Sequence, residues 1–138
     1  MRNYLRYIAV LLFLVYLSLV GFLCFANPEG YPSVDFSFYG IPGDKIIHFL
    51  LFTPYPVLAY LILDKTGRSF LKDFASIVAI FITGALIAYG TEKIQGMTEY
   101  RSFEKWDLAA DIAGLMSSSF LLFMYSIIRR RRHHNEDI

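Results

Sequence analysis

The sequence predicts an all-α membrane protein, a four-helix transmembrane bundle with both termini in the cytoplasm. Hydrophobic residues make up 56% of the 138 residues and charged residues only 18%, and the charges lie mainly between four long apolar runs. A soluble domain has about 45–50% apolar and about 25% charged residues. A disordered chain has few apolar residues and many charges, so that class is excluded too. We expect one domain over residues 1–138 and, at a net charge of +1, no nucleic-acid partner.

The apolar runs define four helices, expected at about 5–27, 44–63, 73–95 and 107–129. A spanning helix needs roughly 20 mostly apolar residues. It must be helical throughout, because lipid offers no water to free backbone groups. The first run could also be a signal peptide, but it is longer than the roughly 7–15 residues of a signal core, so a retained helix is expected. Pro54 and Pro56 predict a kink in the second helix.

The orientation follows from the placement of lysine and arginine. Four basic residues flank the helices on one side: Lys45, Lys93, Arg101 and Lys105. Nine lie on the side that carries both termini: Arg2, Arg6, Lys65, Arg68, Lys72, Arg129, Arg130, Arg131 and Arg132. Basic residues favour the cytoplasmic face, so both termini are expected inside and the more acidic face outside.

The outer end of the second helix carries a carboxylate and an imidazole. Pro42 and Gly43 form a turn, and Asp44 is placed to accept hydrogen bonds from free backbone N–H groups. His48 lies four residues later, on the same face as Asp44. A carboxylate beside an imidazole suits proton transfer or metal binding. The alternative is a helix cap with an interfacial histidine.

The third and fourth helices direct further polar side chains to this end. Glu92 and Gln95 are three residues apart and share a face, while Asp107, Asp111 and Gly114 form one stripe at i, i+4 and i+7. An ionisable group inside a membrane segment is costly and usually faces a partner or a wet cavity. Glycine suits close helix approach. The stripe therefore predicts a functional pocket or, alternatively, a structural lock in which Asp111 pairs with Arg101 or His48.

The predicted pocket has residues of two kinds. Lys45 and Arg101 would hold an anion, and the acids would bind hydroxyl groups. Candidates for acid–base chemistry are His48, Asp44, Glu92 and Asp111. The full set expected to bind a ligand is Asp44, Lys45, His48, Glu92, Gln95, Arg101, Asp107 and Asp111.

These motifs, taken in order, resemble the VanZ-like family of small bacterial membrane proteins, whose namesake is associated with low-level resistance to teicoplanin. The resemblance covers about residues 44–118 and implies a multi-pass protein of the bacterial cytoplasmic (inner) membrane. This family usually has Asn where this sequence has Asp111, which adds an ionisable group. The matching residues are Asp44-Lys45-x-x-His48-Phe49-x-x-Phe52, Glu92-x-x-Gln95, Arg101 and Asp107-x-x-x-Asp111-x-x-Gly114.

Several functions fit these residues. The leading hypothesis is a VanZ-like protein that binds an envelope lipid or cell-wall precursor at the extracytoplasmic face, with tolerance to glycopeptides such as teicoplanin. The second is an acid–base or metal-dependent enzyme acting on a lipid-linked phosphate or sugar, for which Mg²⁺, Ca²⁺ or Mn²⁺ would suit the oxygen-rich donors. The third is a non-catalytic assembly protein, and a transporter is a fourth. The sequence assigns no metal site and no cofactor, and the lipid bilayer is the one partner that its composition requires.

Overall fold

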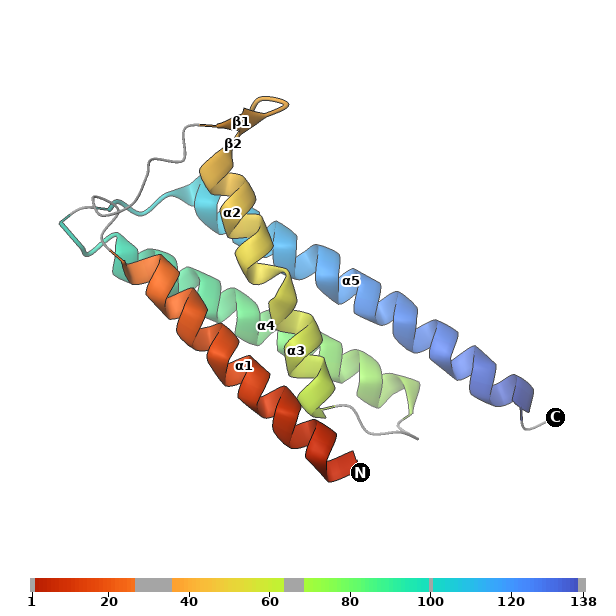
Figure 1. The fold of residues 1–138 in the computed structure, drawn as a ribbon. Helices are drawn as coiled ribbons and strands as arrows, with labels where there is room; N and C mark the ends of the chain where they lie inside the picture. Colours follow the sequence, from red (N-terminus) through yellow and green to blue (C-terminus); the bar gives the residue numbers. More distant parts are fainter. Residues whose placement is uncertain (1, 27–35, 64–68, 100, 137–138) are drawn as a thin grey trace.

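The computed structural model describes residues 2–26, 36–63, 69–99 and 101–136. Over these residues the chain is mostly helical (Figure 1). A two-residue strand pair precedes the second helix, which the all-α prediction did not include, and its turn uses Tyr39 and Gly40 at positive φ. In chain order the elements are α1 (Arg2–Phe25), β1 (Ser37–Phe38), β2 (Ile41–Pro42), α2 (Gly43–Phe52), α3 (Pro54–Leu63), α4 (Phe70–Gln95) and α5 (Lys105–Glu136).

Over the described residues, four helical stretches are long and apolar enough to cross a membrane, as the sequence predicts. They are Tyr4–Phe25, Gly43–Leu63, Phe70–Gln95 and Lys105–Arg130. Many large apolar side chains point outward from them, among them Leu11, Leu86 and Leu121. Such a surface suits hydrocarbon and not water. The fold is therefore that of a multi-pass membrane protein.

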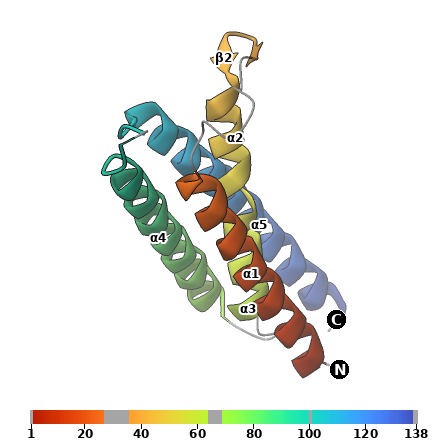
Figure 2. The ribbon, with the colours of Figure 1, turned by 60° about the vertical axis from the view of Figure 1, so that its left-hand side comes forward.

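The second of these stretches is broken where the prolines predict a kink. The helix stops at Phe52 and restarts at Pro54, with Thr53 between α2 and α3. Pro54 and Pro56 have no N–H to donate to the carbonyl groups of the preceding turn. Beside the break, the Tyr16 hydroxyl of α1 donates to the Leu51 carbonyl oxygen at 2.8 Å. Above the kink α2 packs mainly against α5, while below it α3 packs against α1, α4 and α5 (Figure 2).

The crossing of α2 and α5 is unusually close. A Cβ at Gly114 would overlap with the Phe49 carbonyl oxygen and lie 3.1 Å from Thr53 Oγ1. Glycine is the residue that permits this approach. Below the crossing, Phe52 and Leu115 are fully buried in the core. The crossing fixes how the outer turns of α2 and α5 face each other.

The helices alternate in direction along the bundle. α1 begins and α5 ends at the same end, so both described termini lie on one side of the bundle (Figure 1). Helix α5 extends to Glu136, beyond the predicted end near residue 129, so the basic run begins inside a helix. Arg129 and Arg130 there contact the buried Asp73 of α4, at 3.6 and 3.1 Å. The sequence also predicts a short turn at Thr66-Gly67, which lies outside the described residues.

Candidate functional site

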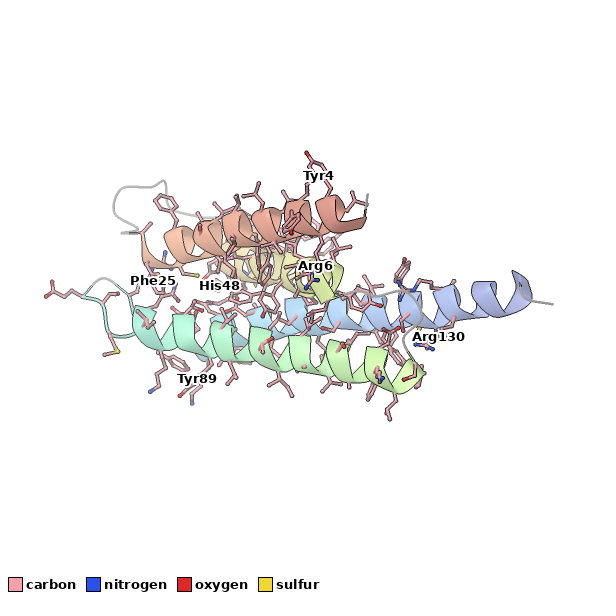
Figure 3. The ribbon with its side chains drawn as sticks, turned by 90° about the horizontal axis from the view of Figure 1, so that it is seen from below. Tyr4, Arg6, Phe25, His48, Tyr89 and Arg130 are labelled. Carbon is pink, nitrogen blue, oxygen red and sulfur yellow. The ribbon has the colours of Figure 1, made fainter. Side chains whose placement is uncertain are left out.

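The start of α2, the end of α4 and the start of α5 meet at one end of the bundle, which we call the His48 end. Figure 3 shows His48 toward the same end as Phe25, and Arg130 at the opposite end. α5 contacts both α2 and α4. The close crossing at Gly114 brings the preceding turn of α5 against the second turn of α2. Polar residues from three helices therefore share one space.

His48 stands at the centre of this space. Its Nδ1 lies 2.9 Å from Asp111 Oδ1 and 3.9 Å from Glu92 Oε1, and its Nε2 lies 3.6 Å from Asp107 Oδ2. The His48 side chain is only 11% exposed. We call these four residues, His48, Glu92, Asp107 and Asp111, the His48 centre. Of the predicted set, these are the side chains that the fold brings together around the imidazole.

Two carboxylate oxygens of the His48 centre have no hydrogen-bond partner among the described residues. They are Glu92 Oε1 and Asp111 Oδ2. Both side chains are buried, each with about 1% of its surface exposed. The other Glu92 oxygen, Oε2, accepts a hydrogen bond from the Glu104 backbone N–H at 3.3 Å. A buried acceptor without a donor costs free energy, and native proteins contain few of them.

Lys45 is surrounded by acids and does not face an open space. Its ammonium group bonds to Asp44 Oδ2 at 2.9 Å, to Glu104 Oε2 at 2.7 Å and to Asp107 Oδ1. We call these four residues the Lys45 cluster. Asp107 belongs to both groups, with Oδ1 toward Lys45 and Oδ2 toward His48. Three carboxylates already bind the Lys45 ammonium group, and the role of Lys45 in holding a ligand anion stays a prediction.

Asp44 does not contact His48, although the two residues are four apart on one helix. It turns instead to Lys45, accepting from the Lys45 backbone N–H at 2.9 Å and from its ammonium group. An ion pair with the ammonium group gives Asp44 a charge-assisted hydrogen bond. Asp44 thus accepts from a free N–H of the first turn, as predicted, while the carboxylate that orients His48 is Asp111.

Gln95 and Arg101 do not contact the His48 centre. Gln95 is buried and donates from Nε2 to the Cys24 carbonyl oxygen at 2.7 Å, so it ties α4 to the end of α1. The prediction that Gln95 points to the start of the second helix is therefore wrong. Arg101 is partly exposed and makes no hydrogen bond or ion pair with another described residue.

Sequence reasoning missed two groups. The first is Glu104, which is exposed and also binds Lys45; its position three residues before Asp107 was the available signal. The second group lies at the opposite end, where the side chain of Asp73 is 3% exposed and pairs with Arg130. Asp73 and Arg130 are far apart in the sequence, so no local spacing could have linked them.

Within the described part of the chain, two sets of side chains have the geometry to hold a metal ion. One ligand atom each from His48, Glu92 and Asp107 lie within 4.8 Å of one another. The same holds for Asp44, Glu104 and Asp107, but the Lys45 ammonium group already binds all three of these acids. In the His48 centre the Lys45 ammonium group binds only Asp107, through Oδ1, and it does not reach Glu92 or Asp111.

Comparisons with known proteins give one similarity. The chain is 25% identical over 114 residues to an uncharacterized protein of Schizosaccharomyces pombe. The match covers 83% of this chain and 62% of the yeast protein, so it spans less than two thirds of that protein's length. No family model matches the chain, and no solved structure matches it. The description of the yeast protein names no activity, so the function is argued from the site.

Proposed function

We propose that this protein binds the polar headgroup of an envelope lipid, or of a lipid-linked cell-wall precursor, in the His48 centre. One observation carries the proposal: Glu92 Oε1 and Asp111 Oδ2 are buried and lack a donor among the described residues. Retaining such atoms costs stability unless something donates to them. A headgroup hydroxyl or amino group supplies that donor.

The charges in the site support a ligand that donates hydrogen bonds. The Lys45 ammonium group is already bound by three carboxylates. Arg101 makes no hydrogen bond or ion pair with another described residue, so its guanidinium group is available to a phosphate oxygen. The ligand therefore presents hydroxyl or amino hydrogens to Glu92 and Asp111, and any phosphate lies at the rim near Arg101.

The membrane and its orientation belong to the same proposal. The resemblance of residues 44–118 to the VanZ-like family supports a place in the bacterial cytoplasmic membrane and a contribution to glycopeptide tolerance. Nine basic residues lie on the side of the termini and four on the opposite side, and this difference supports cytoplasmic termini. The His48 centre then faces the extracytoplasmic side, where cell-wall precursors are used.

Lipid that copurifies with the protein tests the binding proposal. We expect the wild-type protein, purified in mild detergent from a bacterial membrane, to carry one lipid class enriched several-fold over the membrane extract. Glu92→Gln should lose this enrichment. Glu99→Gln is the matched control, because Glu99 is exposed near the same end of α4. Equal lipid profiles for all three proteins and the membrane would contradict the proposal.

The glycopeptide part has its own test. Expression of the chain in a sensitive Gram-positive host should raise the inhibitory concentration of teicoplanin, and expression of Glu92→Gln should not. An unchanged inhibitory concentration with the wild-type chain would contradict the proposed contribution to glycopeptide tolerance. The proposal of lipid binding would still be tested by copurification.

The surroundings of the imidazole favour a second candidate, an acid–base enzyme acting on a lipid-linked phosphate or sugar. Asp111 Oδ1 holds Nδ1 of His48, while Nε2 lies toward Asp107. A ring oriented in this way is suited to moving a proton at Nε2. Purified His48→Ala should then lose turnover of a lipid-linked substrate while eluting as folded protein. Full turnover in this variant would exclude the candidate.

A further inference from the structure

We propose that the His48 centre binds one divalent transition-metal ion, through His48 of α2, Glu92 of α4 and Asp107 of α5. This inference rests on the proposed function, because the ion would lie in the centre that receives the headgroup. One ligand atom from each residue lies within 4.8 Å of the other two. Three separate helices supply these atoms, so the bundle fold assembles the set and no single motif contains it.

The first argument is the orientation of the imidazole. Ligating histidines commonly donate the second ring N–H to a carboxylate, which fixes the tautomer and leaves the other nitrogen for the ion. In this chain Asp111 Oδ1 lies 2.9 Å from Nδ1, and Nε2 lies 3.6 Å from Asp107 Oδ2. Two atoms that each ligate one ion at about 2.1 Å are separated by about 3 Å or slightly more. The distance between Nε2 and Asp107 Oδ2 thus needs little change to hold an ion.

The second argument is that two buried carboxylate oxygens lack a hydrogen-bond donor in the described part of the chain. Glu92 Oε1 and Asp111 Oδ2 are buried and have no donor among the described residues. Glu92 Oε1 lies 3.9 Å from His48 Nδ1, and one Glu92 oxygen lies within 4.8 Å of a His48 ring nitrogen and an Asp107 oxygen, so Glu92 faces the centre. Buried charges in proteins are paired or coordinate metals. A cation in the centre would give the Glu92 oxygen the partner that the protein does not provide.

The third argument is a comparison within the same end of the bundle. The two groups together hold five carboxylates, from Asp44, Glu92, Glu104, Asp107 and Asp111, against one lysine and one histidine. The Lys45 ammonium group satisfies the Lys45 cluster. No protein cation other than His48 itself reaches the Glu92 and Asp111 carboxylates among the described residues. At the His48 end the five carboxyl groups of these two groups therefore outnumber the two basic side chains, even when His48 is counted as positively charged.

The donor set selects the type of ion. Imidazole suits transition metals, and carboxylates suit Mg²⁺, Ca²⁺ and Mn²⁺, so Mn²⁺ fits both kinds of donor. Mn²⁺ takes about six ligands in oxygen-rich sites. One nitrogen and two carboxylates leave positions that phosphate or hydroxyl oxygens of a headgroup could fill. The ion would thereby join the site to its proposed ligand.

Titration of the full-length protein with Mn²⁺ alone tests the inference. The protein, purified in detergent and stripped with a chelator, is titrated while the free-ion signal is followed by electron paramagnetic resonance. We expect one ion per chain. His48→Ala, Glu92→Gln and Asp107→Asn should each weaken binding at least tenfold, and Asp111→Asn about tenfold through the orientation of His48.

Glu104→Gln is the matched control, because it removes a carboxylate of the Lys45 cluster and leaves the three proposed ligands in place. We expect the affinity of the Glu104→Gln variant for Mn²⁺ to differ from that of the wild-type protein by less than threefold. The absence of saturable binding to the wild-type protein up to about a thousandfold excess of Mn²⁺ would overturn the inference, and so would equal weakening by Glu104→Gln and Glu92→Gln.

A second measurement covers variants that fold poorly. Mn²⁺ should raise the melting temperature of the wild-type protein and of Glu104→Gln, since a ligand that binds only the folded state stabilises it. No shift in the wild-type protein would contradict the inference. Lipid copurification is measured on protein purified with Mn²⁺ and, separately, on protein purified with a chelator. Lipid enrichment in a protein that shows no saturable Mn²⁺ binding would overturn the metal site and leave the proposed function in place, while Mn²⁺ binding without lipid enrichment would do the reverse.

Discussion

Asp111 Oδ1 of α5 lies 2.9 Å from His48 Nδ1 of α2, although 63 residues separate them in the sequence. The contact depends on the close crossing one turn below, where Gly114 faces the Phe49 carbonyl group. It also depends on the kink at Thr53, because an unbroken helix would not direct α2 toward α5 in this way. The site is thus a consequence of helix packing as much as of its own residues.

Two substitutions at Asp111 separate its charge from its hydrogen bond. Asp111→Asn keeps an oxygen that accepts from His48 Nδ1–H, so we expect near wild-type yield and melting temperature. Asp111→Leu leaves the buried His48 N–H without an acceptor and should cost about 1–3 kcal/mol of stability. Size-exclusion profiles and thermal melts in detergent measure both. Equal destabilisation by the two variants would show that the charge itself holds the fold.

Gly114→Ala tests the crossing of α2 and α5. The added methyl group would overlap with the Phe49 carbonyl oxygen, and we expect a loss of about 1–3 kcal/mol, seen as a lower melting temperature. Gly90→Ala is the matched control. A Cβ at Gly90 meets nothing within 4 Å, and alanine favours a helix, so this variant should be neutral or slightly more stable. An unchanged melting temperature for Gly114→Ala would contradict the close crossing of α2 and α5.

Tyr16→Phe tests the contact beside the helix break. It removes the hydroxyl that donates to the Leu51 carbonyl oxygen at 2.8 Å, and the expected loss is about 0.5–1.5 kcal/mol. Tyr7→Phe serves for comparison, since Tyr7 is 73% exposed and its change should be neutral. If both variants melt at the same temperature as the wild-type protein, the hydrogen bond of the Tyr16 hydroxyl does not stabilise the break between α2 and α3.

Much of this architecture follows from the sequence, because hydrophobic length and proline act locally. Four membrane-length helices and the interruption before Pro54 are confirmed. The pairing inside the site was harder to predict, since it depends on how helices rotate and cross. Helical spacing alone favours Asp44 as the partner of His48, but Lys45 binds Asp44, and Asp111 reaches His48. The link between Asp73 and Arg130 joins two helices and has no local signature.

Orientation in the membrane is tested by thiol labelling in intact cells. Glu99→Cys places a thiol at the His48 end and Lys72→Cys places one near the start of α4, and both positions are exposed. With cytoplasmic termini, a membrane-impermeant maleimide should label Glu99→Cys and not Lys72→Cys. The native Cys24 is buried and should remain unlabelled. The reverse labelling pattern would place the His48 end in the cytoplasm.

The central claim is that the His48 centre binds a ligand, and that without this ligand its buried carboxylates lower the stability of the folded protein. Glu92→Gln tests this claim most directly. The variant retains an acceptor for the Glu104 N–H and removes a buried charge whose Oε1 has no partner. The measurement is the melting temperature of metal-stripped, delipidated Glu92→Gln against wild type in one detergent. The account predicts a melting temperature equal to or higher than that of the wild-type protein. A decrease of several degrees would show that Glu92 holds the bundle together, and would contradict the account.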